Sequence, residues 1–210
     1  MAIETYPVSP TVPSFSAVNF KINTPSLSTR TNSGMTRRIG MGHSYYSFTV
    51  QHKNLTRFEA GPVLGFIAQQ FGSMDPFNII LPELSYSKTT NQTRTIVTTT
   101  AAAAVGATSV AITGVAVGKE FLRAGDFFQF PNHTKVYMCT STWTSGPLEF
   151  SGGLVQAVPS GTAITYGGTE PIRFRVIFES DVQQWETGIG GLVNISLDMR
   201  EVWGPEQTLV

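Results

Sequence analysis

The chain has 210 residues, which is enough for one large domain or two small ones with a real hydrophobic core. Hydrophobic residues make up 41% of it and aromatic residues 11%, so the composition excludes an intrinsically disordered chain. It contains no apolar run long enough for a transmembrane helix, and residues 1–10 lack the basic and then apolar pattern of a signal peptide. The sequence therefore predicts a folded protein without a membrane anchor.

The charge is low and unevenly placed. Only 13% of the residues are charged and the net charge is zero, whereas a typical soluble domain carries about 25% charged residues. This deficit suggests that much of the surface contacts other protein. Basic residues dominate 1–58, where Glu4 is the single acid, and acidic residues dominate 169–210. The two ends either pair within one fold or meet between the subunits of a ring.

Residues 1–36 are rich in proline, serine and threonine. Prolines at 7, 10 and 13 exclude a helix and a central strand, so we expect an extended N-terminal arm, with a strand near 15–22. If the arm hung free, it would expose apolar side chains to water. It should therefore lie on its own domain or on a neighbouring subunit, and its candidate inter-subunit contacts are Tyr6, Val8, Val12 and Phe15.

A strand is predicted within 39–52, where Tyr46, Phe48 and Val50 share one face. A helix follows, beginning between 57 and 62 and ending at 71. Thr56 and Glu59 have the spacing of a capping box, Pro62 fits a first helical turn, and glycine is typical just after a helix. Residues 76–81 predict another strand.

Residues 87–107, rich in threonine and alanine, are predicted to be a domain junction. The block that follows has closely spaced turns, which suits a small barrel or sandwich. Its predicted short strands lie at 108–113, 127–130, 135–140, 148–150 and 163–166.

Residues 171–203 return to long alternating strands, at 172–178 and 192–202, joined by a loop that carries Trp185. The long strands before 86 and after 171 need each other, because neither set alone makes a sheet with a covered face. The predicted fold is mainly β: a discontinuous β-sandwich domain with one helix, 1–90 plus 170–210, with an N-terminal arm at 1–36. A small inserted β-barrel or sandwich module at 97–168 interrupts it.

The sequence contains no motif that predicts a catalytic, metal or cofactor site. The lone Cys139 forms no internal disulfide and is predicted to be a small buried hydrophobe. The three histidines lack neighbouring acids with metal-binding spacing, and Asp126 and His133 are predicted to be a structural pair. A polymer hydrolase needs paired carboxylates, for which the candidates are Asp126 with Glu149 and Asp181 with Glu186. We expect a protein that is not an enzyme.

Arg30, Arg37 and Arg38 form the most basic cluster. Because phosphate binding needs a broad basic field and the net charge is zero, we expect no nucleic-acid partner. These arginines are instead candidates for a solvated loop or for contacts between subunits.

The stretch YYSFTVQHKNLTRFEAGPVLGFIAQQFGSMDPFNIILP at 45–82 resembles bacteriophage distal tail proteins, the baseplate hub type of minor virion protein. RRIGMGHSYYSFTV and AGDFFQF with HTKVYMCT are also similar to segments of phage structural proteins. The resemblance touches about half of the chain. The family forms a β-sandwich with a helix, and some members carry an added module, which here interrupts the domain instead of following it.

The resemblance implies a non-enzymatic virion protein of the tail tip or baseplate, assembled in the host cytoplasm. It would form a homo-oligomeric ring, of six copies, joining the tail tube to the hub, fibres and other distal parts. An alternative is a receptor-binding or carbohydrate-binding adhesin, in which the inserted module stacks sugar rings on Trp143 and Tyr166.

Overall fold

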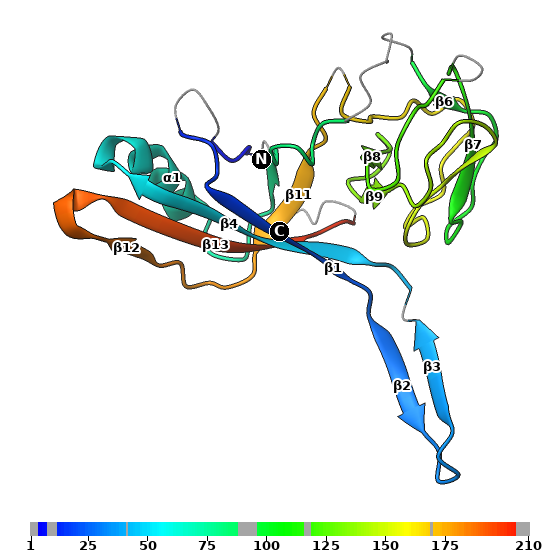
Figure 1. Cartoon of the computed structure of the whole chain (residues 1–210), viewed down its shortest axis with the longest axis horizontal. Coiled ribbons are helices and arrows are strands. Elements are labelled where there is room, and N and C mark those ends of the chain that lie inside the picture. Colours follow the sequence, from blue (N-terminus) through cyan, green and yellow to red (C-terminus); the bar gives the residue numbers. More distant parts are fainter. Residues whose placement is uncertain are drawn as a thin grey trace, which may run out of the picture.

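The computed structural model describes residues 4–7, 12–40, 42–87, 96–115, 119–168 and 170–204. The described chain is mainly β, with one α-helix and several sheets, none of which closes into a barrel (Figure 1). This architecture is consistent with a β-sandwich and confirms the predicted fold class.

The largest sheet is antiparallel, with the strand order β1-β4-β13-β11-β5, and β12 also pairs with β13. At its centre, β4 from the first part of the chain lies beside β13 from the last part, with Val50 opposite Leu197. The predicted loop around Trp185 is wrong, because that segment forms β12 by pairing with the start of β13. The strands are β1 (Ala17–Asn23), β4 (Tyr45–Leu55), β5 (Phe77–Ile79), β11 (Phe174–Phe178), β12 (Trp185–Thr187) and β13 (Val193–Glu201).

Only one face of this sheet is apolar, as the alternation in the sequence indicates. In β13 four alternate side chains are buried, those of Val193, Ile195, Leu197 and Met199. The side chains of Ser196, Asp198 and Arg200 point to the other face and are exposed. The buried face packs against the helix and an aromatic cluster in which the Phe20 and Phe127 ring centroids lie 5.4 Å apart. Phe127 belongs to the inserted segment, so that segment supplies part of this core.

The helix α1 (Arg57–Gln69) confirms the predicted capping box. The Thr56 side chain accepts from the Glu59 backbone N–H, and the Glu59 carboxylate accepts from the Thr56 backbone N–H at 2.8 Å. Because this cap sets the start at 57, Pro62 lies inside the helix and not in its first turn. The buried face of α1, which includes Val63 and Phe66, lies on the main core.

The segment expected to be an extended arm, residues 1–36, contains β1, a second strand β2 (Ser26–Arg30) and the first residue of β3 (Thr36–Gly40). β2 pairs with β3. The turn is closed by Gly34, whose φ of 83° favours glycine, and by a hydrogen bond from the Thr31 N–H to the Met35 carbonyl. This β2–β3 hairpin extends away from the body of the molecule (Figure 1).

The inserted segment forms two small sheets, β10-β7-β6 and β8-β9. The predicted strand at 163–166 is reduced to isolated bridges at Ala163 and Thr165. A second hydrophobic cluster, drawn only from residues 97–166, fills this segment. The exact domain boundaries stay a prediction. The strands are β6 (Thr98–Thr99), β7 (Ser109–Thr113), β8 (Phe127–Gln129), β9 (Val136–Met138) and β10 (Pro147–Glu149), and a 3-10 turn, η1 (Ile189–Gly191), precedes β13.

Candidate assembly surfaces and the junction pocket

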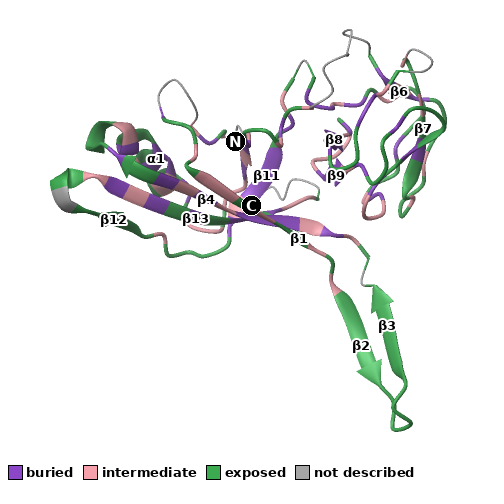
Figure 2. Cartoon of the chain, viewed as in Figure 1, coloured by how far each residue is buried: buried purple, intermediate pink, exposed green. Residues whose placement is uncertain are grey.

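The β2–β3 hairpin is exposed along its whole length (Figure 2). Leu27 and Ile39 lie opposite each other across its two strands, with 56% and 66% of their surface exposed. Arg37 lies two residues before Ile39 and therefore shares their face, whereas Arg30 and Arg38 lie on the other face. One face of the hairpin therefore presents two apolar side chains and one arginine, and the opposite face presents the other two arginines.

An acidic segment, residues 179–187, runs from the end of β11, where the Glu179 N–H donates to the Asp198 carbonyl, to β12, which pairs with the start of β13. Within it Val182 and Trp185 are 77% and 52% exposed, and the carboxylates of Glu179 and Glu186 are also exposed. Asp181 accepts hydrogen bonds from the Ser73 backbone N–H and hydroxyl, which lower the pKa of its carboxyl group. This segment contains no lysine or arginine.

The N-terminal residues predicted as inter-subunit contacts pack on their own chain. Tyr6 is buried, and its hydroxyl lies 3.1 Å from His52 Nε2. Val12 is buried in the same core, and the Phe15 ring packs against it at 5.7 Å from the Tyr6 ring. The sequence left a choice between the chain's own domain and a neighbour, and these residues lie on the former. Val8 lies outside the described residues.

The arginines predicted as inter-subunit contacts have the opposite setting. Arg30, Arg37 and Arg38 are all exposed on the hairpin. Their role as contacts between subunits stays a prediction. The sequence predicted either a solvated loop or a contact between subunits for them and did not predict the strands, because the hairpin has no hydrophobic alternation.

A buried ion pair joins the inserted segment to the main sheet. The Lys135 ammonium, just before β9, donates to the carboxylate of Glu201 at the end of β13. The same carboxylate accepts from the backbone N–H groups of Val136, at 3.0 Å, and Tyr46, at 3.2 Å. Burial raises the pKa of Glu201 and lowers that of Lys135, while the attraction within the pair opposes both shifts. Nothing in the sequence pattern predicted this pair, because its two residues lie 66 positions apart.

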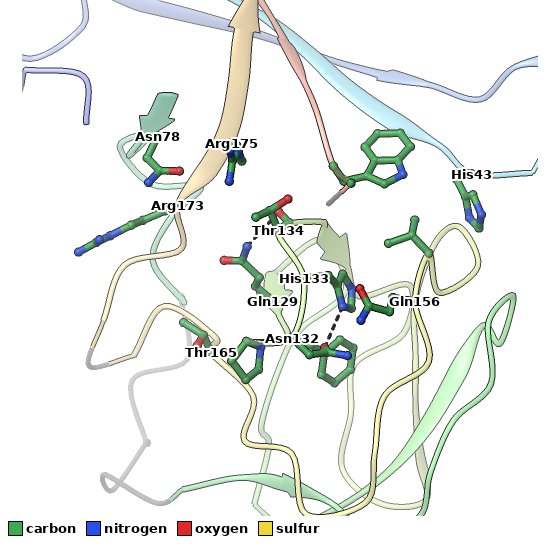
Figure 3. A pocket seen from close by; sticks show the side chains of 15 residues that line it. His43, Asn78, Gln129, Asn132, His133, Thr134, Gln156, Thr165, Arg173 and Arg175 are labelled. Atoms are coloured by element: carbon green, nitrogen blue, oxygen red, sulfur yellow. Dashed lines mark hydrogen bonds between the residues drawn. The ribbon is translucent and has the colours of Figure 1, made fainter. Parts of the chain in front are cut away.

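Beside the ion pair a pocket of about 760 Å³ opens between the main sheet and the inserted segment (Figure 3). One wall comes from Asn78, Arg173 and Arg175, and the opposite wall from the inserted segment. None of the residues that line it carries a carboxylate, so its charged lining is cationic. The lining also includes Trp203, whose ring lies under the Lys135 ammonium at 4.6 Å.

Several polar groups in the pocket wall already bond within the fold. Gln129 Nε2 donates to the Thr134 carbonyl at 2.9 Å, and Asn132 Nδ2 donates to the Ala157 carbonyl at 2.8 Å. His133 bonds Asn132 Oδ1 and the Tyr137 hydroxyl, each at 2.8 Å. Burial and the nearby Lys135 ammonium lower the pKa of His133 to about 4. The predicted pairing of His133 with Asp126 is therefore wrong.

The aromatic residues predicted to stack on sugars are buried instead. Trp143 and Tyr166 are each 9% exposed and belong to the core of the inserted segment. Trp143 Nε1 donates to the Gly146 carbonyl at 2.8 Å, and the Tyr166 and Phe121 rings meet edge to face at 4.9 Å. Both rings pack inside a hydrophobic cluster, so neither presents a face for a ligand.

The other candidates for chemistry take structural positions. The Cys139 thiol is buried and donates to the Ser141 carbonyl, as expected for a small hydrophobe, and burial raises its pKa. Asp126 accepts from the Arg123 backbone N–H, and Glu149 accepts from the Ser141 hydroxyl. Over the described ranges, His, Cys, Asp and Glu side chains form no group of three with the geometry to hold a metal. In the same ranges no helix has the length and apolarity that a bilayer crossing requires.

No family model matches this chain, and no curated protein matches it.

Proposed function

We propose that this protein is a non-enzymatic structural component of a bacteriophage virion, a ring-forming protein of the tail tip that joins the tail tube to distal parts. The single observation that carries the proposal is the β2–β3 hairpin. It extends from the body and has every residue exposed, including Leu27 and Ile39.

The stability of an isolated hairpin supports this reading. Two strands alone are at best marginally stable in water, because they bury too little apolar surface to offset the ordering of their backbone. Within its own chain this hairpin packs no face on the core. A neighbouring subunit that covered the hairpin would bury its apolar side chains and so stabilise it. This is the behaviour expected of an arm that joins subunits.

The low charge of the chain supports the same reading. The cores of large protein interfaces are depleted in charged residues, and arginine is the cation that they retain most often. The hairpin carries three arginines and no lysine. The phage tail itself is supported by the sequence resemblance over residues 45–82.

Two measurements test the proposal. Light scattering coupled to size-exclusion chromatography should give a mass of several subunits, six if the ring follows the tail-tip pattern. Mass spectrometry of purified phage particles from the host should find the chain in the tail fraction. A protein that stays monomeric and is absent from particles would overturn the proposal.

The pocket favours a second candidate, a carbohydrate-binding or receptor-binding role. Arginine and amide side chains beside a tryptophan are suited to hydroxyl-rich or acidic sugars, and the lining contains Arg173, Gln156 and Trp203. Glycan-array binding that is lost in Arg173→Ala or Gln156→Ala, with unfolding unchanged, would support it. The absence of binding to any glycan would remove it.

A further inference from the structure

We infer that the β2–β3 hairpin of one copy docks on the acidic segment, residues 179–187, of the next copy, head to tail. The inference rests on the proposed ring and names the two surfaces that would form its subunit contact. The occupant of each surface is a second copy of this chain.

The two surfaces are complementary in charge. The hairpin, residues 26–40, contains Arg30, Arg37 and Arg38 and no acid, whereas the acidic segment contains Glu179, Asp181 and Glu186 and no base. Opposite potentials of this kind align partners and exclude like-charged faces.

Each surface also has an apolar part. On the hairpin Leu27 and Ile39 share a face with Arg37. On the acidic segment Val182 and Trp185 are exposed, and Trp185, opposite Ile195, lies on the other face of β12 from Glu186, which is opposite Asn194. Apolar side chains exposed beside matching charges are typical of a protein interface and unfavourable on a surface left in water.

The positions of the surfaces prevent them from meeting within one chain. The hairpin projects beyond β1 at one end of the molecule, and β12 lies at the opposite end of its long axis (Figure 1). Unlike patches at opposite ends make a heterologous contact, which closes into a ring when the rotation between subunits allows it. Two identical patches would give an isologous dimer instead.

Charge reversal in matched pairs tests this contact on the full-length protein. The hairpin variant is Arg37→Glu with Arg38→Glu, and the acidic-segment variant is Glu179→Lys with Glu186→Lys. Asp181 is left unchanged because its carboxylate accepts hydrogen bonds from Ser73 within the fold. We expect each variant alone to associate about a hundredfold or more weakly than the wild type, because like charges then face each other. Lys119→Glu, on the exposed surface of the inserted segment, serves as the control and should associate normally.

Mixing the two variants decides the question. An acidic hairpin then meets a basic segment on its neighbour, and the unchanged surfaces pair as in the wild type, so assembly should return with alternating subunits. Wild-type assembly that both variants leave intact would overturn the inference but not the ring. Loss in the hairpin variant without rescue on mixing would also overturn it, because the hairpin would then dock elsewhere. A monomeric wild type would overturn the proposed function as well.

Discussion

Lys135 and Glu201 form an ion pair that is almost completely buried, between side chains 66 residues apart in the sequence. Glu201 occupies the apolar face of β13, in line with Met199, and Lys135 immediately precedes β9 of the inserted segment. The pair therefore fixes where the inserted segment sits on the main sheet. Both oxygens of the Glu201 carboxylate accept hydrogen bonds, since the backbone N–H groups of Tyr46 and Val136 also donate to it.

We expect removal of one charge to be strongly destabilising, because the remaining charge is buried without its partner. Lys135→Met or Glu201→Gln should each lower the free energy of unfolding by about 3–5 kcal/mol. The double variant should cost at least about 1 kcal/mol less than the sum, since it leaves no uncompensated charge and the amide oxygen introduced by Glu201→Gln still accepts from the backbone. Urea denaturation followed by circular dichroism measures all three. Additive effects would contradict the coupling.

The partly buried, neutral His133 makes the stability of the protein depend on pH. The pKa of His133 is lowered to about 4 in the folded state, below the usual value of about 6.5 in the unfolded chain. Its contribution to stability is therefore present above about pH 6.5 and is lost as the pH falls through 4. We expect about 1–2 kcal/mol from this group, reduced by solvent screening because the ring is only partly buried.

His133→Gln is the matched variant for this test, because it retains hydrogen-bonding groups and removes the titration. Between pH 6.5 and 4 the free energy of unfolding should fall less steeply in the variant than in the wild type. Equal slopes over that range would show that His133 does not carry the dependence.

The sequence predicted the main sheet well because its strands alternate. In β4 the sequence predicts that Tyr46, Phe48 and Val50 share one face, and all three are buried. The capping box at Thr56 was also read correctly, since it depends only on residues within one turn. Features of this local kind need no knowledge of the rest of the fold.

The hairpin and β12 were missed for the opposite reason. The β2–β3 hairpin has no buried face, so hydrophobic periodicity cannot mark it, and the available signal was the Asn32-Ser33-Gly34 turn. β12 has three exposed residues and exists as a strand because β13 lies beside it. Lys135 and Glu201 each look like surface charges in the sequence, and only the tertiary fold brings them together.

Loss of the helix cap should have a small and specific cost. Thr56→Ala removes the acceptor for the Glu59 N–H and exposes that group at the start of α1. We expect the free energy of unfolding to fall by about 1 kcal/mol in Thr56→Ala, and by much less in Thr56→Ser, which retains the hydroxyl. Thermal or urea unfolding measures both. A loss as large in Thr56→Ser would mean that the threonine methyl group, and not the cap, is responsible.

Two tryptophans in different settings, one in a core and one on the proposed contact, should respond differently to truncation. Trp143 is buried in the core of the inserted segment, so Trp143→Ala should lower the free energy of unfolding by about 3–5 kcal/mol. Trp185 is half exposed on β12, so Trp185→Ala should change it by less than about 1 kcal/mol while weakening self-association. Denaturation and sedimentation of both variants at equal concentrations separate the two effects. Undiminished assembly in Trp185→Ala would remove that side chain from the subunit contact.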